Sequence, residues 1–127
     1  MDMKNNNRRP KYLNLLKIRL PIGGVVSILH RLTGVMLVLL LPLAIYLLQR
    51  SLQSPVDFVD ITAWFSRNPG RLLWLLIVWV FAQHFFSGLR HLLLDIDIGV
   101  EKSRARAGAW LTFAASGVTV LVLGICL

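Results

Sequence analysis

The chain has 127 residues, of which 56% are hydrophobic and only 16% are charged. Soluble domains are about half apolar and about a quarter charged, so this composition, with its apolar residues gathered in long blocks, excludes an ordinary soluble domain and predicts one membrane domain. The net charge of +8 does not indicate nucleic-acid binding, because the basic residues flank the apolar blocks and form no face with stacking aromatics. One cysteine, Cys126, excludes an internal disulfide and an iron–sulfur site.

Residues 1–21 are mostly polar and contain six of the 14 basic residues. They include no short apolar stretch of the kind found in signal peptides, so we expect no cleavable signal. The segment RPKYLNLLKIRLP alternates basic and apolar residues. We interpret residues 1–21 as an arm at the cytoplasmic membrane surface; a docking arm for a partner is the alternative.

Three apolar blocks are each long enough to cross a bilayer, which takes about 20 residues of helix. They cover about residues 22–48, 72–94 and 107–127. Pro21 suits the start of the first helix, and Pro42 predicts a kink within it. The sequence therefore predicts an all-α membrane protein, with a three-helix transmembrane domain over 22–127.

The segments between these blocks differ in charge. Residues 49–71 are polar and contain two prolines, and we expect them to form a loop. The second connection, DIDIGVEKSRARAG, is short and rich in Lys and Arg, which favours the cytoplasmic side. The prediction is an N-in, C-out topology. Three helices alone cannot hide many polar groups from lipid, so we expect a helical bundle completed by partner helices.

His84 lies inside the second apolar block, in a charge-free stretch from 72 to 89. Counting back from Arg90 places it about 9 Å below the cytoplasmic edge. Ionisable residues at such depth are functional candidates, and imidazole is a strong axial ligand of haem iron. We expect His84 to bind haem iron; a simple interhelical hydrogen bond is the alternative.

Gly88 and His91 share a helix face with His84, at spacings of four and seven residues. Gly88 either clears space for a flat macrocycle or serves close helix packing. His91 lies beside Arg90 at the edge of the span, where a solvated side chain is the simpler interpretation.

Ser27, His30, Arg31 and Gly34 form one stripe on the first apolar helix. A buried arginine suits bidentate pairing with carboxylates, and haem carries two propionates. The alternative is an Arg31 that extends to the headgroups. Ser27 and Arg31 also offer donors suited to a quinone carbonyl, although a serine often bonds back to its own helix.

A haem bound by two histidines needs a second imidazole. Within this chain His30 is the other internal candidate, and it lies closer to the membrane edge than His84, which makes ligation from opposite sides of one iron awkward. We therefore expect the second ligand to come from another chain, and a haem closed on both sides to transfer electrons.

Two motifs resemble a known family. Together with Arg9, Pro10 and Leu15, the patterns S-x-x-H-R-x-T at 27–33 and H-x-x-x-G-L-R-H-L-x-x-D at 84–95 are similar to the cytochrome b556 subunits of succinate dehydrogenase. The similarity runs from about Arg9 to the C-terminus. The chain departs from the family pattern at three positions, which bear on local packing: Lys11, Leu94 and Asp97.

The resemblance implies a large membrane anchor subunit of respiratory complex II, in a bacterial or mitochondrial inner membrane. Its partners would be a small membrane anchor subunit, an iron–sulfur subunit and a flavoprotein subunit. Haem b would be shared with the small anchor, with His84 as one axial ligand, and ubiquinone would be the substrate. The rival interpretations are a haem-b anchor of another respiratory dehydrogenase and a non-redox membrane assembly or transport subunit.

The resemblance also implies roles for individual side chains. Ser27 and Arg31 would lie in the quinone site near the iron–sulfur subunit. His30 and Arg31 would lie near the haem propionates. Asp95 would deliver protons to the quinone site, unless it simply pairs with Arg90 or Arg31.

Overall fold

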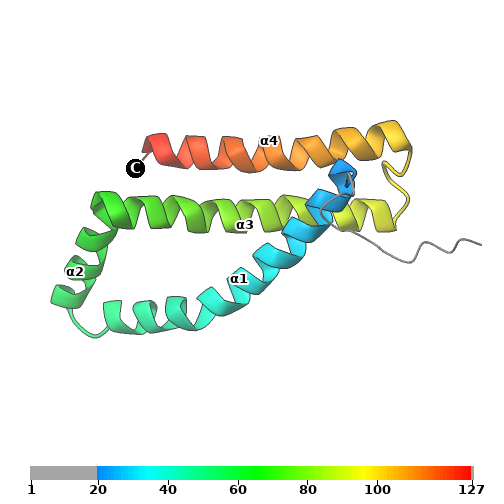
Figure 1. Ribbon diagram of the computed structural model, residues 1–127. Coiled ribbons are helices and arrows are strands. Elements are labelled where there is room, and N and C mark those ends of the chain that lie inside the picture. Colours follow the sequence, from blue (N-terminus) through cyan, green and yellow to red (C-terminus); the bar gives the residue numbers. More distant parts are fainter. Residues whose placement is uncertain (1–19, 127) are drawn as a thin grey trace, which may run out of the picture.

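The computed structural model describes residues 20–126, and every regular element in that range is a helix. The helices are α1 (Ile22–Ser51), α2 (Pro55–Ser66), α3 (Asn68–Asp95) and α4 (Lys102–Cys126) (Figure 1). By length and apolar composition, α1, α3 and α4 can each cross a membrane, which confirms the predicted all-α fold with three spans. The expected arm at 1–21 lies almost wholly outside the described residues, and the N-in, C-out orientation stays a prediction.

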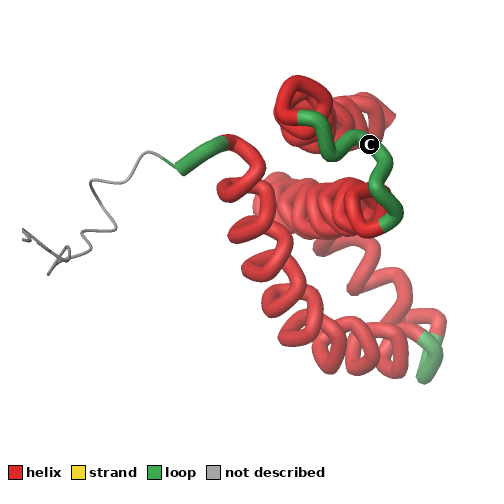
Figure 2. The backbone as a smooth tube through the Cα atoms, turned by 90° about the vertical axis from the view of Figure 1, so that its right-hand side faces the viewer, coloured by secondary structure: helices red, strands yellow, loops and turns green. Residues whose placement is uncertain are grey.

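Helix α1 begins directly after Pro21, as expected, and contains Pro42. Proline lacks the backbone N–H, and its ring crowds the carbonyl four residues earlier, which bends a helix. Figures 1 and 2 both show α1 changing direction along its length: it starts beside α3, leads away from it, and then runs at a distance from α3 toward α2. This distant second half of α1 has exposed apolar side chains, among them Leu41 and Leu43.

Helix α2 corrects the expectation that 49–71 is a loop. The Ser54 hydroxyl accepts a hydrogen bond from the Asp57 amide at 3.0 Å, and Pro55 occupies the first helical turn. Both are signals for the start of a helix, which the expectation of a loop did not take into account. The result is a 12-residue helix that connects the far end of α1 to the start of α3 (Figure 1).

An ion pair holds the corner between α1 and α2. The Arg50 guanidinium donates to the Asp57 carboxylate, which also accepts from the Ser54 hydroxyl at 2.7 Å. The hydrogen bond from Arg50, and to a lesser extent that from Ser54, holds the pKa of Asp57 below its ordinary value. The carboxylate therefore stays ionised, and the corner stays paired, at neutral pH.

Helices α3 and α4 lie side by side over most of their length (Figures 1 and 2). Their interface contains small and polar residues: Ser116 Oγ donates to Gln83 Oε1 at 2.7 Å, and Gln83 Nε2 donates to Ser87 Oγ at 3.1 Å. All three side chains are buried. In lipid there is no hydrophobic driving force between helices, so close packing of small residues and interhelical hydrogen bonds hold them together.

The α3–α4 hydrogen bond gives a direct stability prediction. Replacing Ser116 with alanine leaves the buried Gln83 carbonyl oxygen without this donor, and we expect the purified complex to lose about 1 kcal/mol of stability. Thermal unfolding in detergent measures the loss. The matched control is Thr119→Val, because the Thr119 hydroxyl donates only to Ala115 of its own helix among the described residues. An equal effect of both substitutions would contradict the proposed interhelical role.

Candidate functional site

The three histidines of the chain gather where α1 crosses α3. The rings of His30 and His84 are stacked, with centroids 4.3 Å apart and planes inclined by 13°. The His91 ring lies 5.1 Å from that of His30, at 55°. Helical spacing correctly placed His84 and His91 on one face of α3, but the position of His30 against them depends on how the two helices meet.

The imidazole of His84 is held by backbone and side-chain atoms of α1. Its Nδ1 lies 3.1 Å from the His30 carbonyl oxygen and 3.3 Å from the Thr33 hydroxyl. The carbonyl can only accept, and the Thr33 hydroxyl already donates to the Leu29 carbonyl at 2.7 Å. Nδ1 therefore carries the proton, which leaves the Nε2 lone pair free to bind a metal.

This arrangement joins two interpretations that the sequence left as alternatives. An interhelical hydrogen bond forms at one nitrogen of His84, and the other nitrogen keeps its capacity as a ligand. Thr33 stands in the sequence only as one position of the S-x-x-H-R-x-T motif, so its contact with His84 was not predicted. Its burial, at 1% exposed, is the signal that sets it apart from the other polar residues of α1.

A glycine faces each of the two stacked histidines from the opposite helix. A Cβ atom on Gly34 would lie 3.1 Å from His84 Cε1, and one on Gly88 would lie 3.2 Å from His30 Nε2. Both distances are tighter than ordinary van der Waals contact, so alanine at either position would displace a ring. Gly88 thus lies against the His30 ring at the helix crossing.

Ser27 and Arg31 come together on α1, as the predicted stripe requires. Arg31 Nη2 donates to Ser27 Oγ at 3.4 Å, and its Nε donates to the Ser27 carbonyl oxygen, also at 3.4 Å. Arg31 is exposed in the isolated chain. Since the Ser27 hydroxyl acts as an acceptor here, its own proton stays available, and the pair presents several donors at the flank of α1.

Asp95 is the last residue of α3 and is exposed. Within residues 20–126 the ion pairs are Arg50–Asp57 and Arg104–Glu101, so Asp95 pairs with neither Arg90 nor Arg31 there. Arg90 instead donates from Nη2 to the Ala105 carbonyl oxygen at 3.1 Å. The structure thus places Asp95 at the same end of the bundle as the start of α1, without joining it to Ser27 or Arg31 (Figure 1).

Residues 5–123 match the family described as "Succinate dehydrogenase/Fumarate reductase transmembrane subunit". The chain belongs to this family. It is thus a membrane anchor subunit of complex II, and its three apolar helices fit a multi-pass protein of the bacterial inner membrane.

Two curated relatives of this family cover nearly the whole chain. The succinate dehydrogenase cytochrome b556 subunit of Coxiella burnetii is 31% identical over an alignment of 125 residues, which covers 94% of this chain and 97% of the relative. The protein of the same name from Paracoccus denitrificans is 30% identical over 119 residues, 93% and 91% of the two chains. Both bear out the resemblance seen in the two sequence motifs.

Proposed function

We propose that this anchor subunit binds haem b together with a small partner anchor subunit and contributes to the site where ubiquinone is reduced with electrons from succinate. The observation that carries the proposal is the His84 imidazole, fixed through Nδ1 by α1 with Nε2 left free. The names of the two relatives, both cytochrome b556 subunits, support the haem.

The residues at the α1–α3 crossing fit a haem. His84 would hold the iron, and His30 and Arg31 would lie near the propionates, where a guanidinium and an imidazole can donate to carboxylates. When bound, the haem supplies a one-electron reservoir. The pair Ser27 and Arg31 lies on the same stretch of α1, within two turns of the His30 carbonyl that orients His84.

The second iron ligand belongs to the partner subunit in this proposal. Two imidazoles that bind one iron from opposite sides point their nitrogens at each other across the metal. The rings of His30 and His84 instead stack face to face, with centroids 4.3 Å apart and planes inclined by 13°. This geometry supports the expectation that His30 is not the second ligand.

At the quinone site, Arg31 and Ser27 would donate hydrogen bonds to one quinone oxygen. Donors already fixed on α1 stabilise the negative charge that develops on that oxygen during reduction, because they need not reorganise at that moment. Asp95, exposed and not ion-paired within the described residues, would pass protons toward this end of the bundle.

The partners follow from the same proposal. The iron–sulfur subunit would sit over the end of the bundle where α1 begins and would pass on electrons that the flavoprotein subunit takes from succinate. Apolar side chains on the outer faces, such as Val38 and Leu39 at 70% exposure in the isolated chain, would contact lipid and the small anchor subunit.

A visible absorption spectrum of the purified complex tests this function. We expect a low-spin b-type haem whose spectrum changes when succinate is added, since electrons from the flavoprotein reach the anchor. A complex without pigment would favour the rival non-redox assembly subunit. A haem that dithionite reduces and succinate does not would favour an anchor of another dehydrogenase.

A further inference from the structure

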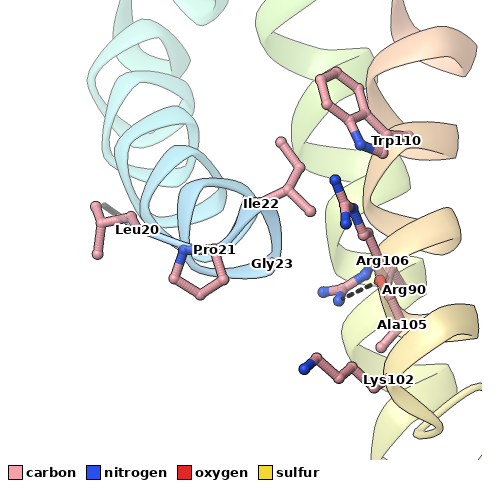
Figure 3. A pocket seen from close by; sticks show the side chains of 9 residues that line it. All are labelled: Leu20, Pro21, Ile22, Gly23, Arg90, Lys102, Ala105, Arg106 and Trp110. Carbon is pink, nitrogen blue, oxygen red and sulfur yellow. Dashed lines mark hydrogen bonds between the residues drawn. The ribbon is translucent and has the colours of Figure 1, made fainter. Parts of the chain in front are cut away.

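A cavity of about 450 Å³ opens at the end of the bundle where α1 begins, α3 ends and α4 begins. Figure 3 shows Arg90 of α3 with Lys102 and Arg106 of α4, whose side chains point toward the first turn of α1. Ile22 and Trp110 supply apolar walls. In the sequence, Lys102 and Arg106 indicate only the cytoplasmic side of the second connection.

This cavity is separate from the site proposed for haem and quinone. Neither Ser27 nor Arg31 lines it, and neither does His84. Ile22, which lines it, precedes Arg31 by nine residues, and at 3.6 residues per turn the two side chains leave α1 about 180° apart. The cavity and the Ser27–Arg31 pair thus share no lining residue, although Gly23, one turn before Ser27, also borders the cavity.

Arg90 is inserted between two other helices. Its guanidinium has room because Gly23 of α1 and Gly108 of α4 lack side chains: a Cβ atom would lie 3.3 Å from Nη2 at Gly23 and 3.7 Å from Nε at Gly108. Nη2 donates to the Ala105 carbonyl oxygen, but the buried Nε has no acceptor among the described residues. A cation in this position is unfavourable unless an anion accompanies it.

The other two cations also favour a negatively charged ligand in the cavity. Lys102 and Arg106 lie four residues apart on α4, a spacing at which like charges repel. No acidic side chain is among the described residues that line the cavity. Three positive charges therefore converge on a space whose lining supplies no negative charge.

We propose that this cavity binds the phosphate group of an anionic phospholipid. It lies at the end of three membrane-spanning helices, and Trp110 marks the level of the headgroups, where tryptophan is enriched. Basic pockets between transmembrane helices are suited to anionic headgroups. The apolar wall around Ile22 accommodates the part of the lipid where the acyl chains begin.

The test compares phosphatidylglycerol with phosphatidylcholine as ligands of the purified complex in detergent, by native mass spectrometry. The variants Lys102→Gln and Arg106→Gln each remove one cation whose side chain is exposed, so neither disturbs a buried contact. The matched control is Arg104→Gln, which removes the same charge from the same turn of α4 but does not line the cavity. We expect about fivefold weaker binding of phosphatidylglycerol in each test variant, and unchanged binding in the control.

Each contrary outcome overturns the proposal in a recognisable way. Equal retention of the two lipids would remove the requirement for an anionic headgroup. Equal weakening by Arg104→Gln would reduce the effect to general attraction by a basic surface. Displacement of phosphatidylglycerol by millimolar inorganic phosphate, with the same sensitivity to Lys102 and Arg106, would assign the cavity to free phosphate. A complex that takes up no phosphatidylglycerol would overturn the proposal outright.

Discussion

Replacing His84 with leucine should remove the low-spin haem spectrum from the purified complex. The side chain of leucine has no lone pair for iron, so the haem would be lost or left with one axial ligand in a high-spin form. The visible spectrum and the haem-to-protein ratio measure this. Succinate oxidation by an artificial dye should continue, because it takes place outside this chain.

The matched control for this substitution is His91→Leu. His91 belongs to the same histidine cluster and the same helix face, but it contacts His30 and has no hydrogen bond to α1 of the kind that orients His84. We expect the control to keep the low-spin spectrum. An unchanged spectrum in His84→Leu, or its loss in both variants, would refute the assignment of His84 as the ligand.

Replacing Arg31 with leucine should reduce ubiquinone reduction by about 10²- to 10³-fold, the usual effect of removing a donor that stabilises a developing oxyanion. Ser27→Ala should have a smaller effect in the same direction, because a neutral hydroxyl stabilises the charge less than a guanidinium does. The measurement is quinone reduction by the purified complex beside succinate-dependent dye reduction, which bypasses the anchor and should be spared.

Two further variants separate this role from a merely electrostatic one. Arg31→Lys keeps the charge but loses the planar fork of donors, so we expect activity between that of the wild type and that of Arg31→Leu. Arg104→Gln removes a surface charge near the same end of the bundle and should leave quinone reduction unchanged. If Arg31→Leu lowers dye and quinone reduction equally, Arg31 supports assembly of the complex and not the quinone site.

The three spans could be predicted because hydropathy is a local property of the sequence. The helices extend beyond these blocks: α4 begins at Lys102, because basic residues continue the helix before the apolar block that starts near 107. Helix α2 was missed because serine and proline, as at Ser54 and Pro55, are favoured both in turns and at helix starts. Only the helical residues that follow them distinguish the two cases.

Parts of the candidate site could likewise be predicted from the sequence, and other parts could not. Spacing along one helix correctly grouped Ser27 with Arg31, and His84 with Gly88 and His91. Contacts between helices could not be predicted from spacing along one helix, because they depend on how two or three helices are placed relative to one another. Examples are the contact of the His30 carbonyl with His84, the burial of Thr33, and the insertion of Arg90 between Gly23 and Gly108. Local patterns carry no information on that position.

The two glycine–histidine contacts have one more consequence. His30 and Gly34 are spaced as His84 and Gly88 are, and each histidine meets the glycine of the other helix, so the crossing has approximate two-fold symmetry. The same H-x-x-x-G pattern, used twice in opposite directions, gives each imidazole a glycine neighbour from the other helix. The remaining surroundings differ: Nδ1 of His84 meets the His30 carbonyl and the Thr33 hydroxyl, whereas the His30 ring has His91 beside it. In the proposed function, the ring held by α1 is the one that binds the metal.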